Sequence, residues 1–373
     1  MNIQMVDLYK QYLKIKGEID LEIQKVIESS VFVKGGKVVE LEENLRKYLN
    51  VNHVITCGNG TDALQLALMA LDIPEGSEVI TTPFTFVSTL EVLALMNLKP
   101  VLADVDPDTF NIVPEKIREC ITPSTKAIVP VHLFGQCADM ESINEIAQKH
   151  NLFVIEDACQ ALGTDYYFKN GTIAKAGTIS DIACNSFFPT KNLGAFGDGG
   201  ALFTNNDELA GKLRSMANHG MSKKYYYNRI GINSRLDAMQ AAILDVKLKC
   251  LDQYVLDRQR AAEFYDRELN GIQEITIPAR VSYSSHSFHQ YTVKVSGRRD
   301  ELKKFLQSKG IPGMVYYPLS LHLQEAYQYL GYRAGDFPVA EKLSEQVLSL
   351  PMHTELTEEE LTHIVASIRE FFN

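Results

Sequence analysis

Short apolar runs alternate with helical patterns between residues 41 and 202, and this alternation limits the possible folds more than any other feature. The runs expected to form strands are 51–57, 78–82, 101–105, 126–133, 152–156, 182–187 and 199–204. Helical patterns cover 61–71, 88–96, 140–150 and 207–217. Strands that are apolar throughout are buried on both faces, as in a parallel sheet. The pattern predicts an α/β domain with a mainly parallel central sheet, flanking helices and right-handed crossovers.

The pattern changes in the last third of the chain. Residues 235–256 form a long helical stretch, which we expect to continue into a second helix through residue 269. Beyond it, the expected strands are 272–277, 288–295 and 314–317, and the expected helices are 300–309, 339–348 and 358–371. This mixture predicts a smaller α+β domain. We place the boundary near residue 250, so that residues 1–250 form the large domain with an N-terminal arm and 251–373 the small one.

Charge and composition exclude several classes of protein. The net charge of −10 repels a polyanion, and the short basic run at Lys223 and Lys224 is interpreted as a solvated loop, so no nucleic-acid partner is expected. The six cysteines are scattered, which predicts free thiols in a reducing compartment. No stretch approaches the roughly 18 apolar residues of a membrane span, and the N-terminus lacks the features of a signal peptide. We expect a cytoplasmic enzyme with no membrane partner.

The segment Cys57-Gly58-Asn59-Gly60-Thr61-Asp62 follows an apolar run and opens a helix. Its glycines allow the backbone to approach an anion, and the helix start offers unpaired N–H groups and the positive end of a dipole. The segment therefore predicts a phosphate site. A tight turn with a Thr or Asp cap remains the alternative.

Two further segments carry the reactive groups. Glu156 and Asp157 end a buried strand, where α/β sheets place their ligands, and a carboxylate there can keep a pyridine nitrogen protonated. Helix capping is the alternative role for Asp157. Lys191 lies in a turn between Ser186 and a glycine-rich run, where a lysine can reach into the pocket and form a Schiff base. A solvated surface lysine is the alternative.

Together, these elements form the set that a fold-type I enzyme dependent on pyridoxal phosphate (PLP) requires. The sequence resembles the DegT/DnrJ/EryC1/StrS family of PLP-dependent nucleotide-sugar aminotransferases from about residue 4 to the C-terminus. The matching segments are Gly58-Asn59-Gly60-Thr61-Asp62-Ala63-Leu64, Thr82-Pro83-Phe84-Thr85-Phe86, Pro130-Val131-His132-Leu133-Phe134-Gly135, Glu156-Asp157-Ala158, Ser186-Phe187-Phe188-Pro189-Thr190-Lys191-Asn192, Gly231-Ile232-Asn233-Ser234-Arg235-Leu236-Asp237, Tyr317-Pro318 and Leu350-Pro351.

The resemblance implies a role for each matching residue. Lys191 would bind the cofactor covalently and then shuttle a proton, and Asp157 would pair with the pyridine nitrogen. The other cofactor contacts that the resemblance implies are Gly60, Thr61 and Ser186 at the phosphate, Gln160 at the ring hydroxyl, Phe86 on the ring face and Asn233 reaching the phosphate from a partner subunit.

The resemblance also implies the reaction and the assembly. Glutamate would donate the amino group, and the acceptor would be a UDP- or dTDP-linked keto-sugar used in polysaccharide or amino-sugar biosynthesis. The active unit would be a homodimer with shared active sites. Arg235, from the partner, would contact a charged part of the substrate or the donor carboxylate, because arginine binds both carboxylate and phosphate in bidentate fashion.

Three further aromatic or histidine sites have two interpretations each. Tyr316, Tyr317 and His322 either line a sugar pocket or belong to the core of the small domain. Residues 225–227, three tyrosines, either form a loop over the site or pack locally. His286 and His289 are spaced for a helical metal site, but the segment is expected to be a strand that separates them onto opposite faces, so no metal is predicted.

The sequence also bears on alternatives to amino transfer at C3 of the sugar. Lysine at position 191 favours amino transfer over the dehydratase branch of the family, where histidine replaces it. The Asn-Ser-Arg-Leu-Asp wording at 233–237 favours amination at C3, with C4 as the nearer alternative. A non-catalytic, PLP-binding regulatory protein of the same fold is a different-class alternative. A nicotinamide-dependent dehydrogenase is excluded, because no GxGxxG follows the first strand with an acidic residue about 20 positions later.

Overall fold

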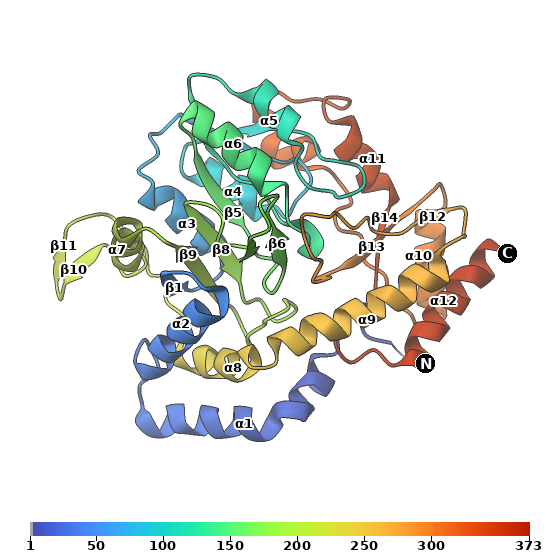
Figure 1. Ribbon diagram of the computed structural model, residues 1–373, viewed down its shortest axis with the longest axis horizontal. Helices are drawn as coiled ribbons and strands as arrows, with labels where there is room; N and C mark the ends of the chain where they lie inside the picture. Colours follow the sequence, from blue (N-terminus) through green and yellow to red (C-terminus); the bar gives the residue numbers. More distant parts are fainter. Residues whose placement is uncertain (1–2) are drawn as a thin grey trace.

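The computed structural model describes residues 3–373, and its centre is a seven-stranded sheet (Figure 1). The strand order is β1-β9-β8-β5-β4-β2-β3. The bounds of these strands are β1 His53–Cys57, β2 Glu78–Thr81, β3 Lys99–Leu102, β4 Thr125–Ile128, β5 Phe153–Asp157, β8 Ile182–Ser186 and β9 Gly200–Thr204. Each strand expected between residues 51 and 204 overlaps a strand of this sheet, with bounds that are shortened or shifted by a few residues.

The sheet is mainly parallel, as predicted. Strands β8, β5, β4, β2 and β3 run parallel, and only β9 is antiparallel to its two neighbours, β1 and β8. Asp157 at the end of β5 pairs with Cys184 of β8. The carboxyl ends of β1, β5 and β8 therefore lie at one edge of the sheet, which is where an open α/β sheet places its ligands.

Helices cover both faces of the sheet because successive side chains of each strand point to opposite sides. Ile55 packs with helices α3, α4 and α7, whereas its neighbour Val54 packs with α2 and α8. Helices α5 and α6 continue the second layer over β4 and β5. The bounds are α2 Gly36–Leu49, α3 Gly60–Ala70, α4 Ser88–Leu95, α5 Pro114–Cys120, α6 Met140–His150, α7 Asp207–Met216 and α8 Ala238–Leu248.

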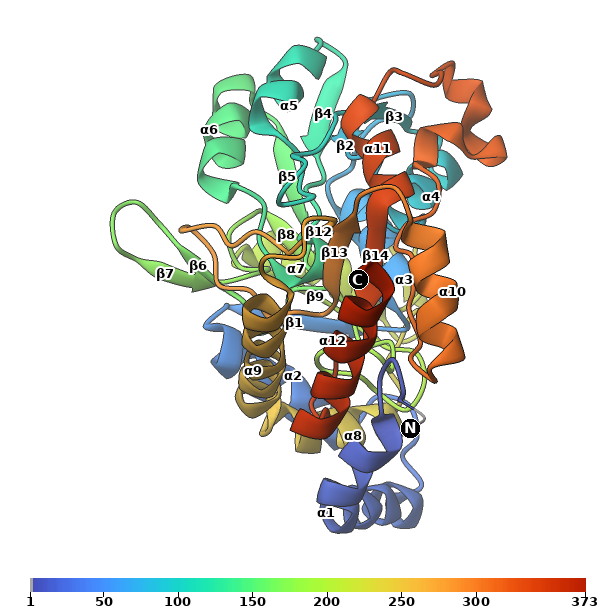
Figure 2. The same cartoon turned by 90° about the vertical axis from the view of Figure 1, so that its right-hand side faces the viewer.

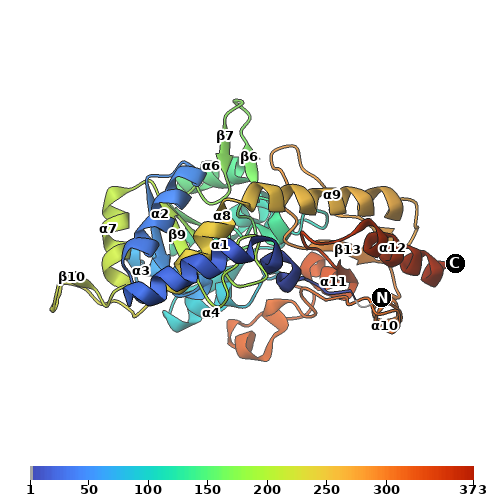
Figure 3. The ribbon, with the colours of Figure 1, turned by 90° about the horizontal axis from the view of Figure 1, so that it is seen from below.

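Helix α1 (Leu8–Ser29) has no counterpart among the expected helices and lies along α8, as Figure 3 shows from below. Ile19 is its most buried side chain and packs against Ile243 and Val246 of α8. Ahead of α1, the Ile3 N–H donates to the Gly310 carbonyl across 3.1 Å. The N-terminal segment thus contacts both the large sheet's helices and the C-terminal part of the chain.

The C-terminal part contains a second, three-stranded antiparallel sheet, β12-β13-β14, flanked by α9, α10 and α12 (Figure 2). The long helix α9 runs from the large sheet to this smaller one (Figure 1). The bounds are α9 Leu251–Leu269, β12 Ile275–Thr276, β13 Tyr291–Val295, α10 Arg299–Ser308, α11 Pro338–Gln346, β14 Val347–Leu350 and α12 Glu358–Phe372. The domain boundary near residue 250 stays a prediction.

Three expectations for this region were wrong. The helix expected over 339–348 ends at Gln346, and Val347 begins β14 because it pairs with Lys294 of β13. The strand expected over 314–317 is reduced to a single bridge between Met314 and Ser349. The strand expected from residue 288 begins only at Tyr291, so the predicted opposite-face placement of His286 and His289 does not apply.

Smaller elements complete the chain. Two hairpins project from the body, β6–β7 in Figure 2 and β10–β11 in Figure 1. Their bounds, with those of the three 3-10 turns, are β6 Asp165–Tyr167, β7 Ile173–Lys175, β10 Met221–Lys223, β11 Tyr226–Tyr227, η1 Leu133–Gly135, η2 Leu321–Leu323 and η3 Glu325–Leu330. Within residues 3–373, no helix has the length and apolar character needed to cross a bilayer.

Candidate active site

A cavity of about 750 Å³ opens at the carboxyl-end edge of the large sheet. It collects most of the residues that were predicted from the sequence to form a site. The predicted residues that line it are Gly60, Thr61, Phe86, Asp157, Gln160, Ser186, Lys191, Tyr316 and Tyr317. Three others, Asn233, Arg235 and His322, do not line it.

The start of α3 forms a cradle that fits a phosphate group. Asn59 caps the helix, and its side chain accepts the Asp62 N–H across 2.8 Å. A Cβ on Gly60 would lie 2.8 Å from the Cβ of Ser186 and 3.2 Å from the Cys159 sulfur, closer than real side chains approach. Glycine is therefore required for this close packing of backbone against the Ser186 turn. The helix start presents its free N–H groups and dipole to the cavity wall.

Asp157 presents its carboxylate from the end of β5 and is 5 % exposed. Its Oδ1 accepts the Cys159 N–H and its Oδ2 accepts the Thr89 hydroxyl, each across 3.2 Å. Two hydrogen bonds orient the carboxylate and leave lone pairs for a ligand. A carboxylate held in this way fits the protonated nitrogen of a pyridine ring.

Lys191 lies in a tight turn after β8, and its backbone N–H donates to the Phe188 carbonyl across 2.9 Å. Desolvation by the cavity walls lowers the pKa of the Lys191 ammonium. Electrostatic interaction with the ionisable groups of Cys159 and Asp157 opposes this shift. A lowered pKa increases the neutral fraction, which is the nucleophilic form of a lysine. The turn therefore supplies a reactive amine within the cavity.

Gln160 and Tyr317 form a fixed pair on the cavity wall. Gln160 Nε2 donates to Tyr317 Oη across 3.2 Å, while Gln160 Oε1 accepts the Phe134 N–H across 2.8 Å. Burial is the main cause that raises the pKa of the Tyr317 phenol, so this group is neutral. Phe86, about half exposed at 53 %, offers its ring to the cavity and tilts against Tyr317.

His322 lies outside the cavity and is engaged by the protein itself. Its Nδ1 is 2.9 Å from Ser320 Oγ and its Nε2 is 3.0 Å from Glu341 Oε1. The side chain is fully buried and packs edge-on against Phe337. This geometry favours the core role that the sequence left open for His322, and it offers no free nitrogen to a substrate.

Asn233 and Arg235 also lie outside their own chain's cavity. Asn233 is exposed, and Arg235 lines a separate cleft with Lys34 and Arg214. Burial, followed by the charge of Arg235, lowers the pKa of Lys34. The intervening residue, Ser234, is buried and faces α3.

Several residues in or beside the cavity were not singled out from the sequence. Thr89 bonds to Asp157, Cys159 neighbours the Gly60 cradle, and His289 and Gln290 enter from the C-terminal part of the chain. Thr89 and Cys159 lie in segments that carry no signal of their own. The pair at 289–290 becomes visible only when the turn before β13 is folded against the large sheet.

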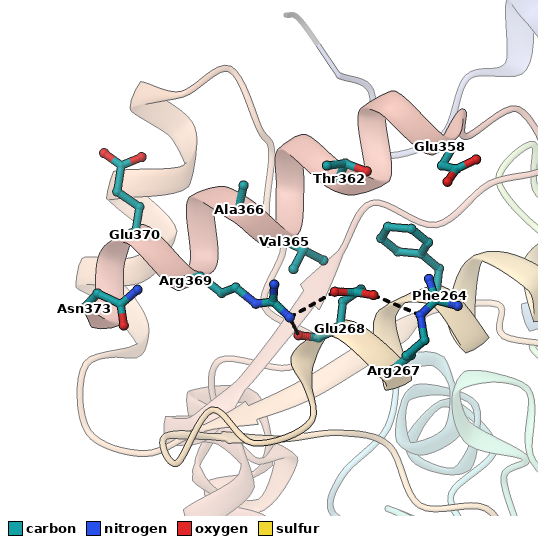
Figure 4. A pocket seen from close by; sticks show the side chains of 10 residues that line it. All are labelled: Phe264, Arg267, Glu268, Glu358, Thr362, Val365, Ala366, Arg369, Glu370 and Asn373. Atoms are coloured by element: carbon teal, nitrogen blue, oxygen red, sulfur yellow. Dashed lines mark hydrogen bonds and ion pairs between the residues drawn. The ribbon is translucent and has the colours of Figure 1, made fainter.

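Two other surfaces lie apart from this cavity. The three tyrosines 225–227 are on the exposed β10–β11 hairpin, which projects from the body of the molecule (Figure 1) and does not line this cavity. A groove between α9 and α12 holds an ion-paired network in which Arg369 Nη2 donates to Glu268 Oε2 across 3.0 Å (Figure 4). It contains none of the predicted site residues. Within residues 3–373, no cluster of His, Cys, Asp and Glu is arranged to hold a metal ion.

The chain was compared with known proteins. Residues 13–369 match the model of the DegT/DnrJ/EryC1/StrS aminotransferase family. The chain is 48% identical to a pleiotropic regulatory protein of Geobacillus stearothermophilus, over 100% of this chain and 99% of that protein. It is 43% identical to the UDP-2-acetamido-2-deoxy-3-oxo-D-glucuronate aminotransferase of Pseudomonas aeruginosa, over 98% of this chain and 99% of that enzyme. A solved structure, NtdA of Bacillus subtilis with bound cofactor PMP, is similar with a TM-score of 0.91 and 32% identity, covering 100% of this chain and 85% of the other.

Proposed function

This chain belongs to the DegT/DnrJ/EryC1/StrS aminotransferase family, and on that premise we propose that it moves an amino group from glutamate to the 3-keto carbon of a nucleotide-linked sugar. Its cofactor is PLP. The observation that carries the proposal is the cavity in which Lys191, with its lowered pKa, lies together with Asp157 and the Gly60 cradle. These are the groups that PLP chemistry requires.

Each residue has a task that follows from its chemistry. The helix start at Gly60 and Thr61, with Ser186, binds the phosphate of the cofactor. Asp157 holds the ring nitrogen protonated, and Lys191 binds the cofactor and then carries a proton to and from the reacting carbon. The bound cofactor supplies an electron sink. Phe86 would pack against the bound ring, and Gln160, oriented by Tyr317, would donate to the ring hydroxyl.

The acceptor is a UDP- or dTDP-linked sugar with a ketone at C3. The relative from Pseudomonas aeruginosa is named for a UDP-linked 3-oxo sugar, and 43% identity over nearly the full chain supports the same substrate class. Tyr316, Tyr317 and Gln290 supply neutral hydrogen-bonding groups to the cavity wall, as suits a hydroxyl-rich ligand. Amination at C4 is the nearer alternative.

The active unit is a homodimer in which Asn233 and Arg235 enter the partner's site. Both lie outside their own cavity, and the segment that precedes them in the chain exposes large aromatic and apolar side chains, including Tyr225, Tyr226 and Ile230. Exposed apolar patches of this kind mark interaction surfaces. Subunit mixing tests the shared site: Lys191→Ala and Arg235→Ala dimers are each inactive, and their mixture regains about a quarter of the parent activity because half the dimers carry one intact site.

The decisive experiment is spectroscopic. We expect the protein loaded with PLP to show a visible band that glutamate bleaches, and Lys191→Ala to lack that band. Borohydride reduction followed by peptide mapping should place the cofactor on Lys191. Lys247 is the internal comparison, because burial also lowers its pKa, to about 8, but its Nζ donates to the Gly194 carbonyl and does not line the cavity. Label on Lys247, or no band at all, would contradict the assignment.

A regulatory role is the second candidate, because a relative 48% identical to this chain is named a pleiotropic regulatory protein. Turnover separates the two functions. A PLP band that glutamate bleaches and a UDP- or dTDP-linked 3-keto-sugar restores indicates an enzyme. A stable band that neither compound changes would favour the regulatory role.

A further inference from the structure

The turn at residues 286–290 belongs to the C-terminal part of the chain but reaches the cavity of the large sheet. Its residues His289 and Gln290 line the same cavity as Lys191. No role was assigned to either residue from the sequence.

The turn is held rigidly against the Lys191 segment. The buried Arg258 donates from Nη1 to the carbonyls of Phe288 and His289, across 3.1 and 3.3 Å. Asn192, the residue after Lys191, donates from Nδ2 to the Ser287 carbonyl across 3.5 Å. Phe288 has a φ of 46°, a left-handed conformation that a bulky residue adopts only when its surroundings impose it. The turn and Lys191 therefore form one unit.

One ring nitrogen of His289, Nε2, is available to donate a hydrogen bond. The side chain is 6 % exposed, and its Nδ1 is sealed without a hydrogen-bond partner among the described residues. A buried unpaired lone pair is tolerated better than a buried unpaired N–H, so the proton belongs on Nε2. Burial, then the charges of Lys191 and Arg258, lowers the pKa of His289, which is therefore a neutral imidazole with a donor at Nε2.

We propose that His289 is a positioning residue for Lys191. In this structure the two described side chains line the same cavity without a hydrogen bond between them, and with PLP bound the Nε2–H of His289 would donate to the nitrogen of Lys191 and hold that nitrogen unprotonated. The proposal rests on the proposed function, because it concerns the lysine that binds PLP. A donor directed at the lysine lone pair stabilises the neutral form and disfavours the charged one. The arrangement would keep Lys191 ready to act as a nucleophile and as a proton acceptor.

Other groups around the cavity also influence this nitrogen, and a test must hold them constant. The titratable side chains that line the cavity beside Lys191 and His289 are Asp62, Asp157, Cys159, Asp198, Tyr316 and Tyr317. Arg258 lies behind the turn as a fixed cation. Substitution of His289 alone leaves all of them in place.

The test is a pH titration of the visible band of the PLP-loaded protein, which reports protonation at the Lys191 nitrogen and needs no substrate. Loss of the donor in His289→Phe is expected to raise the titration midpoint by about one pH unit. His289→Gln keeps an N–H donor and should restore the parent midpoint. A larger, more apolar side chain acting only through packing would lower the midpoint, since desolvation disfavours the charged form.

The matched control is His286→Asn, in the same turn. His286 is buried, stacks on Phe288 and does not line the cavity. Its Nδ1 accepts the Phe288 N–H across 3.0 Å, and the side-chain oxygen of asparagine can keep this bond, so the replacement should leave the midpoint unchanged. If His289→Phe does not fold, His289→Met serves as the apolar variant. An unchanged or lowered midpoint in the apolar variant overturns the role of His289 while the proposed function stands. A parent protein without any lysine-linked band contradicts the proposed function itself.

Discussion

Ser234 Oγ donates a 2.6 Å hydrogen bond to Asp62 Oδ2, and Ser234 Oγ also accepts the Gly58 N–H across 2.8 Å. The serine therefore joins the 233–235 segment to the loop and helix that form the phosphate cradle. In the proposed dimer, this segment carries the residues that enter the partner's site. One hydroxyl thus connects the cofactor cradle of one subunit to the segment that completes the other site.

Ser234→Ala is expected to weaken PLP binding by roughly 5- to 30-fold. The change leaves the Gly58 N–H and the Asp62 carboxylate without their partner, and such losses cost about 1–2 kcal/mol. Absorbance titration of the cofactor-free protein with PLP measures the effect. Ser222→Ala is the control, because Ser222 lies on the exposed β10–β11 hairpin and bonds only to the nearby Tyr226 carbonyl. Equal PLP affinity in the two variants would contradict the link.

Tyr317→Phe should lower PLP affinity by about fivefold, because Gln160 loses the partner that orients its Nε2 and a neutral hydrogen bond contributes about 1 kcal/mol. The neighbouring change Tyr316→Phe is the matched control, since Tyr316 also lines the cavity but is not bonded to Gln160. It should leave PLP affinity unchanged. The prediction fails if both variants bind PLP alike.

His322→Ala should reduce the free energy of unfolding by about 2–4 kcal/mol, because it removes the hydrogen bonds that the ring makes with Ser320 and Glu341 and opens a void where the ring is buried. Urea denaturation measures this loss. The KM for the sugar acceptor should stay within about twofold of the parent, since the ring does not reach the cavity. His150→Ala, at an exposed helix end, should be neutral in stability. A large rise in KM without loss of stability would restore His322 as a substrate contact.

Lys247 gives a pH-dependent contribution to stability. Burial lowers the pKa of Lys247 from 10.5 to about 8, so between pH 8 and 10.5 the unfolded chain binds a proton that the folded protein has released. The free energy of unfolding therefore rises with pH through this window, by at most about 3 kcal/mol. Below pH 8, both states are protonated, and the folded protein bears the full desolvation cost.

Lys247→Met should lack this rise when urea denaturation of both proteins is compared at pH 7, 8.5 and 10. Parallel pH profiles would show that the Lys247 pKa is not lowered.

Most of the large sheet could be predicted because its information is local. Each strand from β1 to β9 of that sheet is an apolar run bounded by turn residues, and burial on both faces follows from the run itself. Helix α1 could not be predicted in the same way. Only one side of it is buried, against α8, and several of its apolar side chains, such as Leu13 and Leu21, are exposed.

For the candidate site as well, local features could be predicted from the sequence and long-range pairings could not. Gly60, Asp157 and Lys191 were found from the sequence because their chemistry is set by nearby residues: a helix start, a strand end and a glycine-rich turn. The pairing of Gln160 with Tyr317 joins residues that are 157 positions apart, and no periodicity or spacing encodes it.

The sequence by itself therefore determined the mainly parallel sheet and the family, and it singled out Lys191 as the candidate reactive lysine, because propensity, burial pattern and motif act over a few residues. Only the tertiary structure decided that Val347 begins a strand, that His322 belongs to the core and that His289 lines the same cavity as Lys191. These outcomes depend on which distant surfaces meet, and a backbone or side-chain hydrogen bond is formed only once its partner has been brought within about 3 Å.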